Sequence, residues 1–232
     1  MSDKKLVQDL SDGIEESLDT KFYWGNDERF RLKHLPLGIA SIDKALSGGL
    51  AFDRMPEIIG ESSAGKTLLA YLAIKAAQDR GLPSLLIDVE HSFEPEWPLK
   101  LGLNLGEGGL RVCRPKDGEE AFRVGTAFVR RGKGILVIDS LASMAPAAEV
   151  SSLKDDELFT RQFMGGQARM INAGVRALVN ENNGAVVVLI NQLRSAVGLV
   201  YGNPEVVPGG KGQRFHAWQV IKVKRGAWLT EG

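Results

Sequence analysis

Short apolar runs alternate with amphipathic stretches along most of the chain. From Glu57 onward the runs EIIG, SLLIDVE, LRVC, GILVIDS and AVVVLIN are rich in Val, Ile and Leu. They are separated by stretches such as TLLAYLAIKAAQ, EEAFRVGTAFVRR and ARMINAGVRALVN, and a shorter helix is expected near WPLKLGL. Continuous apolar strands between amphipathic helices are typical of a mostly parallel sheet with helices on both faces. The pattern therefore predicts an α/β doubly wound core.

Polar residues end several of these apolar runs. Ligands bind doubly wound sheets beyond the carboxyl ends of the strands. We therefore expect Gly60, Glu90, Asp139 and Gln192 to converge on one site.

The N-terminal segment has a different pattern. Leucine or isoleucine recurs every four residues from Leu6 to Leu18, which predicts an amphipathic helix, and DTKFYWGNDERFRLKH follows as an extended arm. We expect residues 1–34 to form this helix and arm, and residues 35–232 to form the core. The pattern leaves open whether the helix and arm pack on their own domain or serve in oligomerisation by docking on a neighbouring subunit.

Composition narrows the classes of protein. The 232 residues are 44% hydrophobic, enough for one substantial core, and the formal net charge is zero. Any polyanion is therefore expected to bind through a local cluster of cations. Cys113 is the one cysteine, and the three histidines share no metal-ligand spacing. With no signal peptide or membrane-spanning run, we expect a cytoplasmic protein with no membrane partner.

A phosphate-binding loop lies between the first apolar run of the core and the following helix. GESSAGKT fits the pattern G-x-x-x-x-G-K-T in the strand-to-helix context that this motif requires. Its backbone amides and lysine suit the phosphates of a nucleotide, and its threonine suits Mg²⁺. The alternative is a glycine-rich turn with a structural role. The predicted nucleotide-binding residues here are Gly60, Glu61, Ser62, Ser63, Ala64, Gly65, Lys66 and Thr67.

Acidic residues end two of the predicted strands. Asp139 is placed to hold Mg²⁺ together with Thr67, although a strand-ending aspartate can also cap a turn. Asp88 and Glu90 lie two positions apart, so on a strand both would face the same side. One of them is expected to orient and deprotonate the attacking water, and spacing does not choose between them.

Several longer segments extend the similarity to a known family. They are GESSAGKT, IDVEHSFEP, ILVIDSLASMAPAAE, MGGQARM and LINQLRSAVGLVYGNPEVVPGGKGQRF. From about Leu35 to Val223 the chain resembles the ATPase core of RecA-type recombinases, including their phage relatives. The resemblance implies a RecA-like P-loop NTPase core that uses ATP and Mg²⁺.

The resemblance also implies roles within the nucleotide site. Glu90 is expected to activate the hydrolytic water and Lys66 to assist catalysis, with Asp88 a structural neighbour. Trp97 is expected to stack on the adenine, and Glu94 to lie near its exocyclic amine. The alternative for Trp97 is a core tryptophan beside two prolines.

Gln192 is implied to be a catalytic sensor of the γ-phosphate that leads into a loop at 193–212. That loop is long and rich in Gly and Pro, and its apolar and basic side chains suit single-stranded DNA. The alternative is a lid over the nucleotide. The loop residues expected to bind DNA are Arg194, Val197, Gly198, Leu199, Tyr201, Gly209, Gly210 and Lys211.

A second DNA-binding element is implied on the helix through MGGQARMINAGVR. Its expected contacts are Met164, Arg169, Asn172 and Arg176, and the last three are spaced to line one helical face. An exposed polar face has the same spacing.

Two features depart from the family pattern. The stretch VSSLKDDELFTRQF is longer than the corresponding first DNA loop and carries three acids, which oppose phosphate binding. Whether they lie outside the DNA path or lower the affinity stays open. The sequence also stops at Gly232, before a lysine pair that reaches the neighbour's ATP in bacterial recombinases. We expect either a core truncated at its C-terminal end or a minimal form that uses Lys222, Lys224 or Arg225 instead.

The leading hypothesis is a DNA-dependent ATPase that forms a helical homo-oligomeric filament on single-stranded DNA. It would pair this strand with homologous double-stranded DNA and exchange strands. One alternative is a paralogue that binds ATP and DNA and regulates recombination without strand exchange. Another is a KaiC-like or hexameric-helicase ATPase, which the segment GNPEVVPGG argues against.

Overall fold

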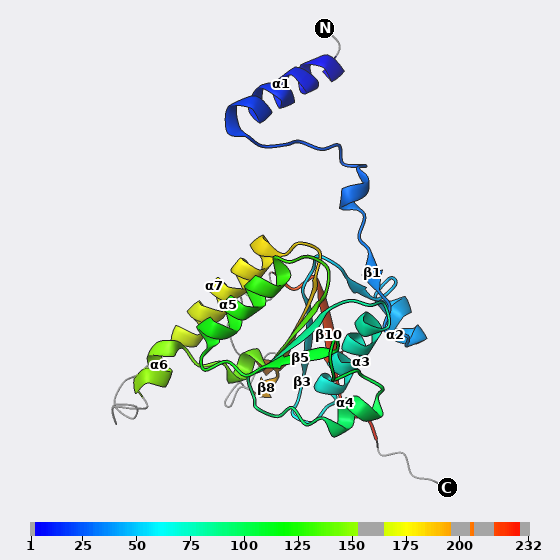
Figure 1. Ribbon diagram of the computed structural model, residues 1–232. Helices are drawn as coiled ribbons and strands as arrows, with labels where there is room; N and C mark the ends of the chain where they lie inside the picture. Colours follow the sequence, from blue (N-terminus) through cyan, green and yellow to red (C-terminus); the bar gives the residue numbers. More distant parts are fainter. Residues whose placement is uncertain (1–2, 153–164, 196–204, 207–215, 228–232) are drawn as a thin grey trace. The chain divides into compact units, whose positions relative to one another are not determined.

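The computed structural model describes residues 3–152, 165–195, 205–206 and 216–227. The chain divides into two compact units, Met1–Lys33 and His34–Gly232. Figure 1 colours them along the sequence from blue to red.

The first unit contains helix α1 (Asp3–Leu18), which forms where the leucine stripe predicts a helix. An irregular segment follows, with one turn of 3-10 helix, η1 (Glu28–Phe30). Asp27 caps this turn by accepting a hydrogen bond from the Arg29 amide at 3.0 Å, and the Arg29 guanidinium stacks 3.5 Å from the centre of the Tyr23 ring. The predicted arm therefore contains one local turn, which is held by contacts of Arg29 with Asp27 and Tyr23.

The second unit is built on a six-stranded sheet with the order β10-β3-β7-β6-β4-β5. All of its neighbouring strands pair in parallel. The predicted α/β class with a mostly parallel sheet is therefore confirmed. In sheet order, the strands span Gln219–Val223, Pro56–Gly60, Val186–Gln192, Ile135–Asp139, Ser84–Asp88 and Leu110–Cys113.

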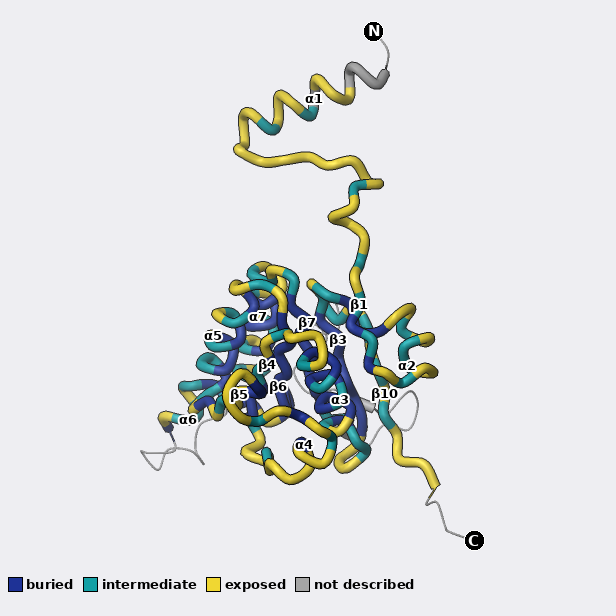
Figure 2. Tube along the Cα trace, turned by 45° about the vertical axis from the view of Figure 1, so that its right-hand side comes forward, coloured by how far each residue is buried: buried dark blue, intermediate teal, exposed yellow. Residues whose placement is uncertain are grey.

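The central strands are buried on both faces because their residues alternate between two apolar clusters. In β6, Ile135 and Val137 belong to one cluster, while Leu136 and Ile138 belong to the other. All four side chains are completely buried, and the sheet is the dark blue centre of Figure 2. This two-sided burial explains why the strands read as continuous apolar runs.

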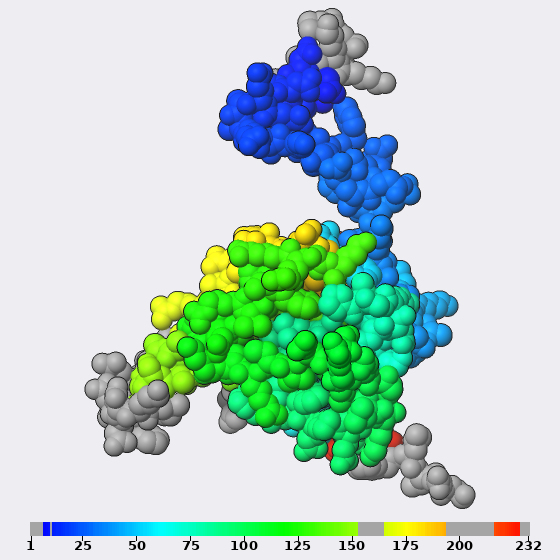
Figure 3. Space-filling model, in the orientation of Figure 1, coloured from blue at the N-terminus to red at the C-terminus, as the bar shows by residue number. Residues whose placement is uncertain are grey.

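Helices supply the other half of each cluster. Helix α3 (Lys66–Gln78) packs on one face, and helices α5 (Gly118–Val129) and α7 (Gly166–Glu181) pack together on the opposite face. In Figure 3 the green surface of α5 lies beside the yellow surface of α7. None of the helices in the described part of the chain is long and apolar enough to cross a membrane.

The remaining elements are short. Strands β1 and β2 form an antiparallel pair that the apolar pattern does not predict. Strands β8 and β9 also pair, within the segment expected to be one long loop. The short elements are β1 (His34–Leu35), α2 (Ala40–Ala45), β2 (Leu50–Ala51), α4 (Glu96–Lys100), η2 (Leu141–Ser143), α6 (Ala147–Ser152), β8 (Arg194–Ser195) and β9 (Glu205–Val206).

Close packing of α5 against α7 gives a test of the fold. A β-carbon on Gly174 would lie 2.2 Å from the ring of the buried Phe122, whereas one on Gly166, in the same helix, would have its nearest neighbour, the Pro146 side chain, at 3.7 Å. We expect Gly174→Ala to lower the free energy of unfolding by about 1–3 kcal/mol because of overpacking. Gly166→Ala is the matched control and should change it by less than about 1 kcal/mol. Equal urea midpoints for the two variants would contradict this packing.

Candidate functional site

The phosphate-binding loop connects β3 to α3 at the carboxyl edge of the sheet. Ser63 and Gly65 have φ angles of 57° and 99°, in the left-handed region, so the loop curls around a concavity of backbone amides. Gly60 is needed for another reason, because a β-carbon there would lie 2.4 Å from the carbonyl oxygen of Val223 in β10. The loop ends at the N-terminus of a 13-residue helix, which favours an anion.

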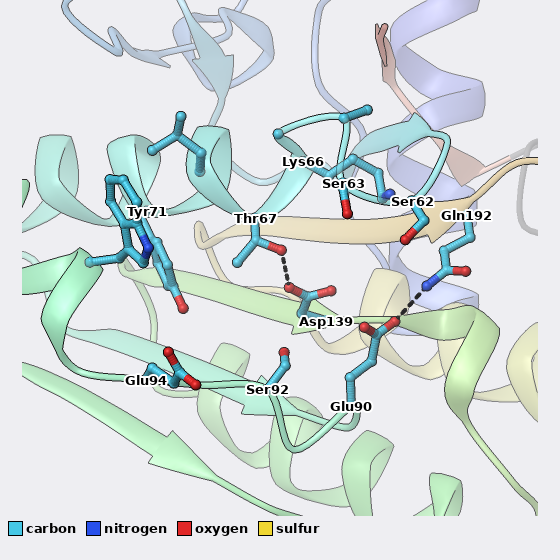
Figure 4. Close-up of a pocket in the computed structure, with 14 residues that line it drawn as sticks. Ser62, Ser63, Lys66, Thr67, Tyr71, Glu90, Ser92, Glu94, Asp139 and Gln192 are labelled. Carbon is cyan, nitrogen blue, oxygen red and sulfur yellow. Dashed lines mark hydrogen bonds between the residues drawn. The ribbon is translucent and has the colours of Figure 1, made fainter. Parts of the chain in front are cut away.

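A cavity of about 600 Å³ lies against this loop (Figure 4). It is lined by residues from the loop, from the ends of β6 and β7, and from the segment after β4. The lining residues are Ser62, Ser63, Ala64, Gly65, Lys66, Thr67, Leu68, Tyr71, Glu90, Ser92, Glu94, Trp97, Asp139 and Gln192. Of the predicted nucleotide-site residues, Gly60 and Glu61 belong to the same loop but do not line the cavity.

Lys66 provides the cation of the cavity. Its side chain is largely buried, and its ammonium donates a hydrogen bond to the Glu61 carbonyl at 2.7 Å. Burial lowers the pKa of Lys66, while the negative charges of Asp139 and Glu90 act to raise it. A poorly solvated ammonium beside the amides of the loop is suited to a phosphate group.

Thr67 and Asp139 lie together on the floor of the cavity. The Thr67 hydroxyl donates to a carboxylate oxygen of Asp139 at 2.7 Å, as the dashed line in Figure 4 shows. Burial raises the pKa of Asp139 to about 6; the Thr67 hydrogen bond opposes this shift, and the charge of Glu90 adds to it. A hydroxyl and a buried carboxylate at this separation fit Mg²⁺, which takes few protein oxygens and completes its shell with water and phosphate.

Glu90 projects into the cavity from the segment after β4. Its Oε1 atom accepts hydrogen bonds from the hydroxyls of Ser140 at 2.5 Å and Ser143 at 3.0 Å. The same oxygen accepts one from the Gln192 amide at 2.9 Å, which Figure 4 marks. Glu90 is exposed, so its carboxylate can reach a water molecule in the cavity.

Asp88 is buried and directed elsewhere. Its carboxylate accepts from the amides of Ser92 at 2.9 Å and Phe93 at 3.2 Å, and from the Arg114 guanidinium at 3.0 Å. The expectation that Asp88 and Glu90 share one strand face is wrong, because β4 ends at Asp88. Asp88 therefore holds the loop that carries Glu90, and only Glu90 lines the cavity.

The chain turns after β4 because the amides of Val89 and Glu90 both donate to the Asp139 carbonyl, at 2.8 and 3.3 Å. This pair of bonds attaches the Glu90 segment to the end of β6. The catalytic candidate and the metal-site candidate are thus held by one backbone junction.

The other end of the cavity is aromatic. Trp97 is 60% exposed, so the alternative of a core tryptophan is wrong. Lys100 lies 5.3 Å from its ring, and Glu94 lines the cavity nearby. An exposed indole beside a carboxylate can stack on and orient a purine base.

Tyr71 is a cavity residue that the sequence motifs did not identify. It lies four residues after Thr67, on the same face of α3, and packs edge-on against Phe93 with ring centres 6.4 Å apart. Burial raises the pKa of Tyr71 to about 12, and the charges of Asp139, Asp88 and Glu94 add to this. Helical spacing from Thr67 was the signal that could have identified it.

The residues expected to bind DNA are described only in part. On α7, Arg169 and Arg176 are exposed, whereas Asn172 is half-buried and its side-chain oxygen is buried, so of these three predicted contacts only the two arginines are exposed. Arg194 begins β8. Met164, Val197, Gly198, Leu199, Tyr201, Gly209, Gly210 and Lys211 lie outside the described residues.

Comparisons with known proteins agree with this arrangement. The model of the RecA N-terminal domain matches residues 15–232. Protein RecA of Bacillus licheniformis is 35% identical over 212 residues, covering 90% of this chain and 59% of that protein. Protein RecA of Frankia casuarinae is 37% identical with the same coverage, and that of Caldanaerobacter subterraneus is 37% identical over 90% of this chain and 60% of that protein. The chain therefore spans about three fifths of the length of these curated relatives.

The different surroundings of Asp88 and Glu90 give a direct test. Asp88→Asn should lower the free energy of unfolding by about 1–3 kcal/mol, because Arg114 and the loop amides lose a charged acceptor. Glu90→Gln, at an exposed position, should change it by less than about 1 kcal/mol. Urea denaturation without nucleotide measures both. A larger loss in Glu90→Gln than in Asp88→Asn would contradict these assignments.

Proposed function

The chain belongs to the RecA family, and we propose that it is an ATP-dependent recombinase that acts as a filament on single-stranded DNA. In this proposal it promotes pairing and strand exchange with homologous double-stranded DNA in the cytoplasm. The observation that carries the proposal is the convergence of a phosphate loop, a hydroxyl–carboxylate pair, Glu90 and Gln192 on one cavity.

The cavity would bind ATP with its triphosphate at the loop and its base at Trp97. Loop amides and Lys66 would hold the phosphates, while Glu94 would lie near the base. Thr67 and Asp139 would hold Mg²⁺, which supplies positive charge against the phosphate oxygens when bound.

Glu90 is the best-placed general base for hydrolysis. The reaction forms a bond between a water oxygen and the γ-phosphorus and breaks the bond from that phosphorus to the bridging oxygen. One water proton passes to the Glu90 carboxylate, and the electron pair of the broken bond leaves with ADP. Because Oε1 already accepts three hydrogen bonds, Oε2 is the oxygen assigned to the proton.

Gln192 connects this chemistry to the segment expected to bind DNA. It ends β7 beside the phosphate loop, where it pairs with Gly60 in the sheet, and β8 follows almost at once. A terminal phosphate would offer its amide a partner besides Glu90. Such a differential contact is what allows a nucleotide to shift a conformational equilibrium and thereby DNA affinity.

DNA binding and assembly extend the proposal beyond the cavity. The exposed arginines on α7 form a local cationic face in a chain with zero formal net charge. Such a face is suited to a phosphate backbone. Residues 1–34 are proposed to serve in oligomerisation. The family match favours this proposal over a KaiC-like ATPase.

Nucleotide hydrolysis in the presence of DNA tests the central proposal. Single-stranded DNA should raise the ATP hydrolysis rate of the wild-type chain, because the segment proposed to bind DNA follows directly after Gln192, which lines the nucleotide cavity. Glu90→Gln should lower kcat by at least about 100-fold through loss of the base. Gln192→Ala should retain nucleotide binding and lose the stimulation by DNA. Wild-type hydrolysis at the same rate with and without DNA would contradict the proposal.

The base-stacking assignment has its own test. Trp97→Ala should weaken ADP binding by about 5- to 150-fold, the loss of one aromatic stack of about 1–3 kcal/mol. Leu99→Ala is the matched control, since Leu99 is similarly exposed on α4 but does not line the cavity. Fluorescence titration with a labelled ADP measures both affinities. Equal affinities in the two variants would remove Trp97 from the base site.

A further inference from the structure

The carboxylate of Glu90 is held asymmetrically. The hydroxyls of Ser140 and Ser143 and the amide of Gln192 all donate to Oε1. A carboxylate oxygen has two lone pairs, so three donors more than fill its accepting capacity and leave Oε2 as the oxygen open to a further partner. The orientation of the carboxylate, and hence the direction in which Oε2 faces, depends on this group of donors.

The three donors are not equivalent. Gln192 is the residue proposed to contact the γ-phosphate, so its bond to Glu90 is the one that nucleotide binding would change. Ser140 and Ser143 come from the end of β6 and the turn η2, and their hydroxyls lie 3.3 Å from each other. The two serines can therefore hold Glu90 whether or not Gln192 does.

Ser143 is fixed by its neighbours although its own side chain is exposed. Leu141, Ala142 and Met144 on either side of it are buried, and its amide donates to the Ser140 carbonyl at 3.2 Å. The Gln167 side chain of α7 donates to the carbonyls of Ala142 at 3.1 Å and Met144 at 2.8 Å. Helix α7 thus clamps the backbone on both sides of Ser143.

We propose that Ser143 is a positioning residue that directs Oε2 of Glu90 toward the attacking water, and that Gln167 holds Ser143 in place from α7. The proposal rests on the proposed ATP hydrolysis. Because α7 also carries the exposed arginines expected to contact DNA, the same clamp joins the DNA-binding helix to the catalytic base through side chains of the described region.

Steady-state kinetics with the full chain test this proposal. Ser143→Ala should lower kcat by about 3- to 10-fold, because one of the three hydrogen bonds that orient the carboxylate is lost, with KM and ADP affinity within twofold of wild type. Ser143→Thr keeps the hydroxyl and should restore at least half of the wild-type kcat. Ser41→Ala, an exposed serine on α2, is the matched control. An unchanged kcat in Ser143→Ala, or a Thr variant as slow as the Ala variant, would overturn the proposal.

The clamp from α7 is tested by combining substitutions. Gln167→Ala should lower kcat in the same direction as Ser143→Ala, and the double variant should be no slower than the slower single variant, because both act through one contact. If the reductions in kcat of the two single variants multiply in the double variant, Gln167 and Ser143 act independently, and the proposed clamp is refuted.

A nucleotide-free measurement separates this inference from the proposed function. In urea denaturation, the effects of Ser143→Ala and Glu90→Ala should be non-additive, because the wild-type side chains share a hydrogen bond that neither alanine can form. Additive effects would refute the contact itself. A wild-type chain that hydrolyses no ATP would instead refute the proposed function, and the catalytic assignment of Ser143 with it, while non-additivity would still establish the contact.

Discussion

Parallel pairing of the strands is the constraint on which the rest of this structure depends. Because all six strands of the sheet run in one direction, their carboxyl ends meet at one edge. The register aligns Gly60 with Gln192 and Asp88 with Asp139. Each of these residues ends its strand, so a shift of register would exchange the two faces of that strand and separate the residues that line the cavity. Core packing and assembly of the cavity therefore depend on the same register.

The cavity contains two charged side chains, Lys66 and Asp139, that are buried and therefore poorly solvated. Burial lowers the pKa of Lys66 and raises that of Asp139, so both groups lie in surroundings that disfavour their charged forms. Such an arrangement is stabilised by a ligand that brings the missing charges, a polyphosphate for the lysine and a divalent cation for the aspartate. Asp88 differs because Arg114 and two backbone amides satisfy it within the protein. Lys66 and Asp139 line the cavity, whereas Asp88 is satisfied within the protein, and this difference supports the ligand-binding roles proposed for Lys66 and Asp139.

The sequence predicts the sheet, the phosphate loop and their convergence because each depends on short-range patterns. Continuous apolar runs report two-sided burial, and the glycines of the loop report special backbone geometry. The choice between Asp88 and Glu90 could not be made in this way, since it depends on the Asp139 carbonyl, which turns the chain after β4. Ser143 and Gln167 were missed because each is recognised only by a tertiary contact, whereas Tyr71 could have been found from its helical spacing to Thr67. The apolar pattern also gave no signal for the β1–β2 pair, because each of these strands has two residues and is too short to show an alternation.

The donors around Glu90 suggest how a base can be both oriented and regulated. If Gln192 alone held the carboxylate, any response of Gln192 to nucleotide would also release the base from its working position. The two hydroxyls from the end of β6 and from η2 remove that conflict, because they reach the same oxygen from a backbone anchored by buried side chains. Gln192 is then able to exchange partners while the carboxylate keeps its direction. In the proposed mechanism, sensing and proton transfer can therefore share one carboxylate because separate elements supply its hydrogen bonds.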